Sequence, residues 1–158
     1  MDQHTALWQA LQQQLNHDLT TTSQLAELLE RERQALETRN YDQFQHLIGE
    51  KNQLVSQLEA NGKQRQQWIQ SSGMSDERDA LEQARQHNPA LANLWETLAD
   101  QWRQCQHNNA VNERVAQRTR LAVSQLLDTL RGQNGQQRLY TANGNAAESG
   151  SGNTITRA

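Results

Sequence analysis

The chain has no glycine or proline between Pro89 and Gly132. Because these two residues weaken a helix interior more than any others, this stretch predicts one long helix. The residues after Gly132 are rich in Gly, Asn and Ser, which predicts a flexible tail. A long helix with such a tail cannot enclose an active site by itself, but it can offer an apolar face to a partner chain.

Two further long helices are predicted upstream. Leucines spaced by three, four and seven residues predict a helix over residues 5–38. Asn40, with Gln43 three residues later, is typical of a helix N-terminus, and an apolar stripe follows as far as about Ser71. Because the connection over residues 38–41 is very short, the two helices must fold back antiparallel.

A short third helix is predicted over residues 77–86, with Ser75 or Asp76 as its cap. Asn88 followed by Pro89 is a strong start signal for the long fourth helix. It remains open whether Pro89 separates two helices or kinks one.

The composition favours long, narrow helices. Hydrophobic residues make up 34% of the chain and the mean hydropathy is −1.00, which suits one apolar stripe per helix better than a thick core. We therefore predict an all-α fold: residues 1–131 form an antiparallel, coiled-coil-like bundle of three to four long helices, and residues 132–158 form a flexible tail.

The net charge, the single cysteine and the N-terminus indicate which partners and which cell compartment to expect. A net charge of −3 makes nucleic acid a poor partner. The single cysteine, Cys105, excludes an intramolecular disulfide framework and fits a reducing compartment. The N-terminus does not resemble a signal peptide, and no apolar run is long enough to span a membrane. We expect a cytoplasmic protein without stable membrane insertion.

No pattern in the sequence indicates catalysis, a metal or a cofactor. None of the five histidines follows a glutamate by three residues, and paired cysteines are absent. Cys105 follows Trp102 by one helical turn on the apolar stripe, which favours a buried, packing role. We predict that the chain is not an enzyme.

The four tryptophans are either anchors for a partner or part of the core. Trp95 and Trp102 lie on the stripe of the fourth helix, and we interpret them as core residues. If the first two helices pair antiparallel, Trp8 and Trp68 lie at the same end, which also favours a structural role.

Asn109 and Asn112 interrupt the apolar stripe of the fourth helix. A buried asparagine can fix the register of packed helices through hydrogen bonds. The alternative is that the helix leaves the bundle here and faces water. The sequence leaves both interpretations open.

An apolar face reappears after these asparagines, and if no other helix covers it, it is a candidate binding surface. We expect its residues to be Val111, Val115, Ala122, Val123, Leu126, Leu127 and Leu130. Leu139 and Tyr140 form a lone apolar pair further on. They are either a docking motif in the tail or a tether without further function.

Three segments in this order resemble the FlgN family of flagellar type III export chaperones. LLERERQALETRNYDQFQHLIGEKNQLVSQLE, residues 28–59, resembles the first hairpin of that family. LWETLADQWRQCQHNNAVNERV, residues 94–115, resembles its later Trp- and Asn-containing segment, and RLYTANG, residues 138–144, resembles the aromatic motif after its last helix.

The resemblance implies a chaperone for the two hook–filament junction proteins, FlgK and FlgL. Such a chaperone would hold the C-terminal segments of these clients and deliver them to the flagellar export apparatus at the membrane. It would bind them through its last helix and the residues after that helix, a region that includes the apolar face described above. The alternative from another class is a structural coiled-coil protein that only self-associates, as a homodimer for example, and has no client.

Overall fold

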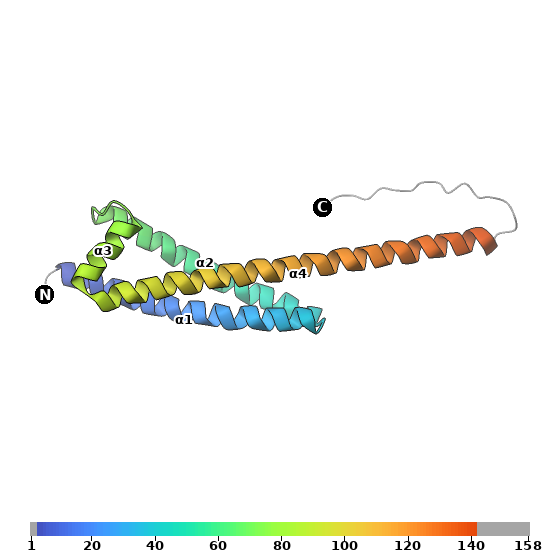
Figure 1. Ribbon diagram of the computed structural model, residues 1–158, viewed down its shortest axis with the longest axis horizontal. Helices are drawn as coiled ribbons and strands as arrows, with labels where there is room; N and C mark the ends of the chain where they lie inside the picture. Colours follow the sequence, from blue (N-terminus) through green and yellow to red (C-terminus); the bar gives the residue numbers. More distant parts are fainter. Residues whose placement is uncertain (1–2, 142–158) are drawn as a thin grey trace. The chain divides into compact units, whose positions relative to one another are not determined.

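The computed structural model describes the backbone of residues 3–141 and the side chains of residues 3–132 (Figure 1). This part of the chain contains no strands, and its helices are α1 (Gln3–Glu37), α2 (Tyr41–Ser71), α3 (Glu77–His87) and α4 (Pro89–Thr141). The predicted all-α fold is therefore confirmed. Because α4 begins at Pro89, after the separate helix α3, the proline divides two helices rather than kinking one.

A tight turn joins α1 and α2 into the predicted hairpin. Arg39 adopts a positive φ of 56°, and the Asn40 N–H donates to the carbonyl of Ala35 at 2.8 Å. This closure of a helix C-terminus usually uses glycine, because a side chain disfavours the left-handed conformation. The side chain of Asn40 then accepts a hydrogen bond from the Gln43 N–H at 3.2 Å, which confirms the predicted cap of α2.

Local capping also fixes the ends of α3 and the start of α4. Asp76 rather than Ser75 caps α3, because its side chain accepts a hydrogen bond from the Asp79 N–H at 2.8 Å. The Asn88 side chain accepts from the Ala90 N–H at 3.0 Å, one residue after Pro89. The chain thus reverses direction between α2 and α4 over a single short helix.

The α1–α2 hairpin is built on two stripes whose residues are spaced alternately by three and four positions. This spacing is the heptad pattern of coiled coils, in which each stripe packs into the other. In α1 the stripe consists of Leu11, Leu15, Asp18, Thr22, Leu25, Leu29, Glu32 and Leu36. In α2 it consists of Phe44, Leu47, Lys51, Leu54, Leu58, Asn61, Arg65 and Trp68.

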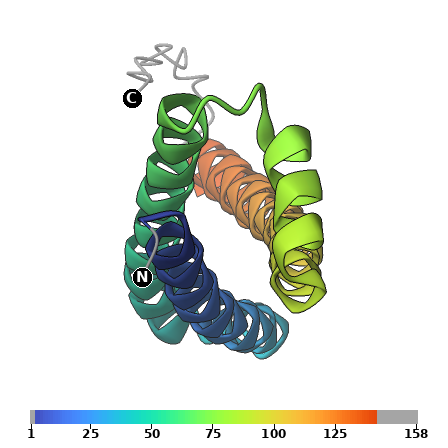
Figure 2. The ribbon, with the colours of Figure 1, turned by 90° about the vertical axis from the view of Figure 1, so that its left-hand side faces the viewer.

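The chain divides into two compact units, whose described parts are residues 3–116 and 117–141. In the first, the hairpin and the beginning of α4 lie side by side, and α3 connects α2 to α4 at one end (Figures 1 and 2). Trp8 and Trp68 meet edge to face at this end, with ring centroids 5.5 Å apart, as predicted. Cys105, Leu25, Leu29 and Leu58 pack together further along the bundle.

Helix α4 does not end at Gly132 as predicted but continues to Thr141. A helical glycine costs only about 1 kcal/mol relative to alanine, no proline follows, and the intervening glutamines, arginine and leucine are good helix formers. The boundary predicted between residues 131 and 132 therefore coincides neither with the end of the helix nor with the limit of the first unit. Residues 142–158 of the predicted tail lie outside the described residues.

Candidate functional site

Helix α4 carries one apolar stripe that runs through both units. From Leu91 to Leu130 its positions are spaced alternately by four and three residues, the same heptad pattern as in the hairpin. The stripe consists of Leu91, Trp95, Leu98, Trp102, Cys105, Asn109, Asn112, Ala116, Thr119, Val123, Leu126 and Leu130. Residues 91–116 of this stripe are called the covered seam below.

The covered seam is packed against the hairpin and α3. Trp95 is 4% exposed and donates from Nε1 to a carboxylate oxygen of Glu77 at 3.2 Å. Cys105 is 3% exposed, and burial raises the pKa of its thiol. The predicted packing role of Cys105 and Trp95 is confirmed, while Trp102 is half-buried.

A polar network joins the covered seam to both helices of the hairpin. The buried ammonium of Lys51 lies 3.0 Å and 3.2 Å from the two carboxylate oxygens of Glu32, and it donates to the Asn109 Oδ1 at 2.9 Å. Asn112 is 3% exposed and donates from Nδ2 to the Leu29 carbonyl at 2.9 Å and to Glu32 at 3.2 Å. Both asparagines therefore form hydrogen bonds with the hairpin, and α4 has not left the bundle at this point, as the register interpretation requires.

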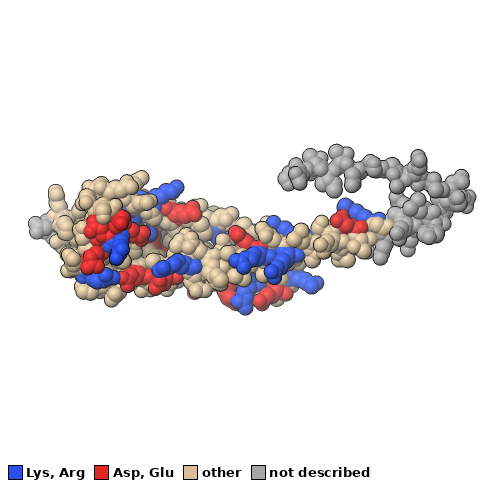
Figure 3. Space-filling model, turned by 45° about the horizontal axis from the view of Figure 1, so that its top comes forward, with Lys and Arg blue, Asp and Glu red and all other residues tan. Residues whose placement is uncertain are grey.

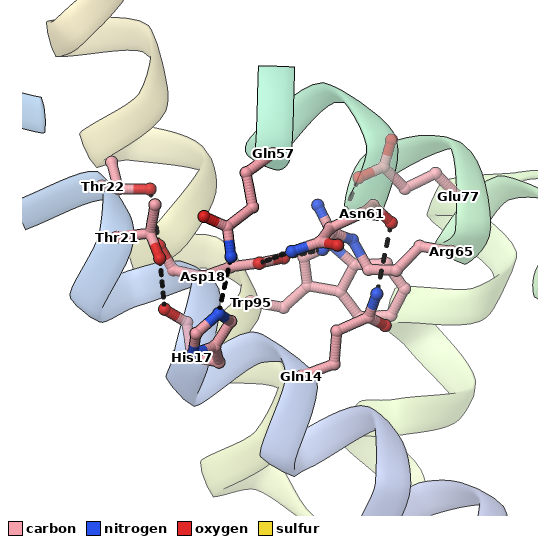
Figure 4. Close-up of polar contacts among 10 residues, drawn as sticks. All are labelled: Gln14, His17, Asp18, Thr21, Thr22, Gln57, Asn61, Arg65, Glu77 and Trp95. Atoms are coloured by element: carbon pink, nitrogen blue, oxygen red, sulfur yellow. Dashed lines mark hydrogen bonds and ion pairs between the residues drawn. The ribbon is translucent and has the colours of Figure 1, made fainter. Parts of the chain in front are cut away.

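A second polar network lies within the hairpin (Figure 4). Asp18 is fully buried, accepts a hydrogen bond from the Asn61 Nδ2 at 2.6 Å and forms an ion pair with Arg65. The Thr22 hydroxyl donates to the Asp18 carbonyl at 2.7 Å. Because buried charges are costly unless paired, any slip of α1 against α2 that separates Asp18 from Arg65 is strongly disfavoured.

Sequence reasoning missed the buried Asp18 and Glu32, and it missed the half-buried Asn61 and Arg65 as partners of Asp18. The signal was present, because each occupies a position of the α1 or α2 stripe at heptad spacing. A charged residue at such a position indicates an oppositely charged partner across the seam. Lys51 on the α2 stripe and its partner Glu32 on the α1 stripe follow the same rule.

The apolar stripe continues beyond Ala116 but is exposed there. The exposed fractions are 48% for Val123, 60% for Leu126, and 47% for both Leu127 and Leu130. Val115 is 39% exposed, and Ala122 is also exposed. At roughly 100° per residue these side chains fall on one side of the helix. Val115, Ala122, Val123, Leu126, Leu127 and Leu130 are called the exposed face below.

The remaining predicted site residues have different positions. Val111 is half-buried, so it borders the covered seam instead of continuing the exposed face. Leu139 and Tyr140 lie within α4, but their side chains are outside the described ones. Leu121 is 63% exposed but lies on the opposite side of the helix from Leu130, about 180° away.

Neither the charges nor the titratable groups indicate a reaction centre. Acidic and basic side chains lie next to one another on the face shown in Figure 3. Within the described residues, no group of three His, Cys, Asp or Glu side chains is placed to hold a metal ion. None of the helices described contains an apolar stretch long enough to cross a membrane.

The family assignment rests on a match that covers most of the chain. A family model described as FlgN protein matches residues 1–148. Searches of the curated proteins and of the solved structures give no match. The members of the matched family are chaperones that bind flagellar export substrates, and they are not enzymes. Because the match extends over far more than half of the 158 residues, this chain belongs to the FlgN family of flagellar export chaperones.

Proposed function

We propose that the chain is a cytoplasmic chaperone for FlgK and FlgL that binds the C-terminal segments of these two proteins through its exposed face and delivers them to the flagellar export apparatus. The observation that carries the proposal is the exposure of a heptad stripe whose members would be buried in any stable coiled coil. Leu126 and Leu130 are 60% and 47% exposed. A contiguous aliphatic face that stays exposed on a folded monomer is typical of a binding surface.

The heptad spacing specifies the kind of segment that fits this face. A client helix with apolar residues at intervals of three and four would lay them between Val123, Leu126, Leu127 and Leu130. Each fully buried leucine contributes about 1.5–3 kcal/mol. Ordering a client segment that is otherwise unfolded consumes part of this energy. The result is an affinity high enough to mask an aggregation-prone segment and low enough to permit its release.

The polar network of the covered seam supports client binding at the exposed face instead of within the first unit. A client helix could in principle invade the first unit and replace α4. Displacing Asn112 and Asn109 would leave the buried Glu32 and Lys51 without two of their hydrogen-bond partners, which is costly. The network therefore directs an incoming apolar helix to the exposed face.

Leu139 and Tyr140 stay a predicted second contact. Their place within α4 puts them on the same helix as the exposed face, beyond Leu130. A client segment longer than the exposed face, or a component of the export apparatus, would reach them.

Co-purification with tagged FlgK and FlgL tests the proposal. Leu126→Glu combined with Leu130→Glu places two charges on the exposed face, and we expect it to abolish capture. Leu121→Glu combined with Gln125→Glu adds the same charge at the same spacing on the other side of the helix, where Leu121 is 63% exposed, and should leave capture intact. Equal capture by both variants, with unchanged helicity, would show that the clients bind elsewhere.

A further inference from the structure

A groove runs along the first unit between α2 and α4. It consists of three adjoining cavities of about 330, 380 and 150 Å³. The first two share Trp95, Glu77, Arg65 and Gly62, and the second and third share Trp102 and Glu59. Along α4 the groove extends from Trp95 to Asn109, about 21 Å at the helical rise.

The groove is apolar inside and acidic at the side of α2 and α3. Leu58, Leu98 and the two tryptophans line the central cavity. Among the charged lining residues, Lys51 and Arg65 form ion pairs with Glu32 and Asp18. Arg103 of α4, which also lines the groove, is paired with Asp100. Glu59 and Glu77 form no ion pair with any described residue, so each is free to pair with an incoming cation.

Residues 117–131 of α4 have the complementary features. They also cover about 21 Å of helix, and they carry the exposed leucines and Val123. Arg120 and Arg131 lie on the same flank of this apolar stripe, close to Leu127 around the helix axis. Arg120 forms no ion pair with any described residue.

We propose that residues 117–131 of a second copy of the chain occupy this groove. The two α4 helices then run antiparallel, with Trp95 of one copy beside Arg131 of the other and Asn109 beside Gln117. This register places a two-fold axis at Glu113, so each copy fills the groove of the other. A symmetric, self-complementary interface of this kind closes on itself and forms a dimer.

The charges agree with this register. Glu77 contacts Trp95, which lies level with Arg131 of the second copy. Glu59 lines the groove together with Trp102 and Gln106, and the latter is level with Arg120 of the second copy. Both acidic residues therefore face an arginine.

The dimer has a consequence that rests on the proposed function. It buries the exposed face, so the same residues cannot hold a client at the same time. Client binding and self-association then exclude one another, and the chaperone keeps its aliphatic surface covered until a client displaces the second copy.

Sedimentation of the full chain without any client tests the dimer independently of the proposed function. We expect a concentration-dependent dimer. Glu59→Arg and Arg120→Glu should each raise its dissociation constant by several-fold to roughly tenfold, and the two together should restore it. A chain that is monomeric at every concentration overturns the proposal, and so does a dimer that is insensitive to the single charge reversals.

Disulfide formation tests the register. In a Cys105→Ala background, Ala99→Cys with Leu127→Cys should give covalently linked dimers on oxidation, because these positions are level with one another in the antiparallel pair. Ala99→Cys with Leu121→Cys, whose second cysteine lies on the other side of the helix, should not give linked dimers. Equal cross-linking of both pairs would overturn the proposed register.

Discussion

The two parts of the α4 stripe have the same spacing and opposite surroundings. In the covered seam, Leu91 and Cys105 are 1% and 3% exposed, whereas Leu126 and Leu130 of the exposed face are 60% and 47% exposed. Their composition differs as well. The covered seam includes tryptophans, a cysteine and two asparagines, which match particular neighbours, while the exposed face is almost purely aliphatic. The spacing of the residues identifies an apolar face, and their composition indicates whether that face packs permanently against other helices of the same chain.

The largest difference in stability is expected between a variant that loses a buried cation of the first unit and one that loses an exposed cation of the second. Lys51→Met leaves the buried Glu32 carboxylate without its counter-ion, and we expect the free energy of unfolding to fall by about 3–5 kcal/mol. Arg118→Met, in the exposed part of α4, should change it by less than about 0.5 kcal/mol. Urea denaturation followed by circular dichroism measures both values.

A double variant shows whether the loss comes from the unpaired charge. Lys51→Met combined with Glu32→Gln buries no unpaired charge, and the glutamine can still accept the hydrogen bond from Asn112. It should recover most of the lost stability. If the double variant is as unstable as Lys51→Met alone, the contribution of Lys51 is packing rather than neutralisation of Glu32.

The second comparison is between the stability losses caused by truncating a buried leucine and an exposed one. Leu47 is completely buried and Leu126 is 60% exposed. Leu47→Ala should lower the free energy of unfolding by about 2–5 kcal/mol through lost burial and the cavity that remains. Leu126→Ala should change it by less than about 0.5 kcal/mol, measured on dilute protein so that self-association does not contribute. Similar losses in the two variants would mean that the exposed face is covered within the monomer.

The helices could be predicted from the sequence because spacing and capping are local. The cap at Asn40 and the start at Pro89 both follow from the residue types at those positions. The end of α4 could not be predicted in this way. Gly132 weakens a helix without breaking it, so the helical residues after it decide where the helix ends.

The exposure of the central residues of the candidate face was predicted correctly, whereas the surroundings of its first residue were not. Leu126, Leu127, Leu130 and Val123 are exposed on one side of α4. Val111 is half-buried, because the covered seam extends to Ala116, and the spacing alone cannot show where covering neighbours end. The pairing of Asp18 with Arg65 was missed for a related reason, since it joins residues on two helices whose relative register only the folded hairpin defines.

The smallest effect concerns the thiol of Cys105 in the covered seam. Burial raises the pKa of this thiol above its ordinary value of 9.0. Above pH 9 the unfolded chain releases the thiol proton while the folded chain retains it, so deprotonation favours unfolding. The contribution of this group to stability is complete below pH 9 and is lost as the pH rises from there through the folded-state pKa.

The measurement compares the unfolding free energy of the native chain with that of Cys105→Ala under reducing conditions. The difference should be constant up to about pH 9, and above that pH the native chain should lose stability relative to the variant. Lysines and tyrosines also titrate in this range, but they are common to both proteins and cancel in the difference. A difference that stays constant at higher pH would mean that water reaches Cys105, and that the covered seam opens far more readily than its packing against Leu25, Leu29 and Leu58 implies.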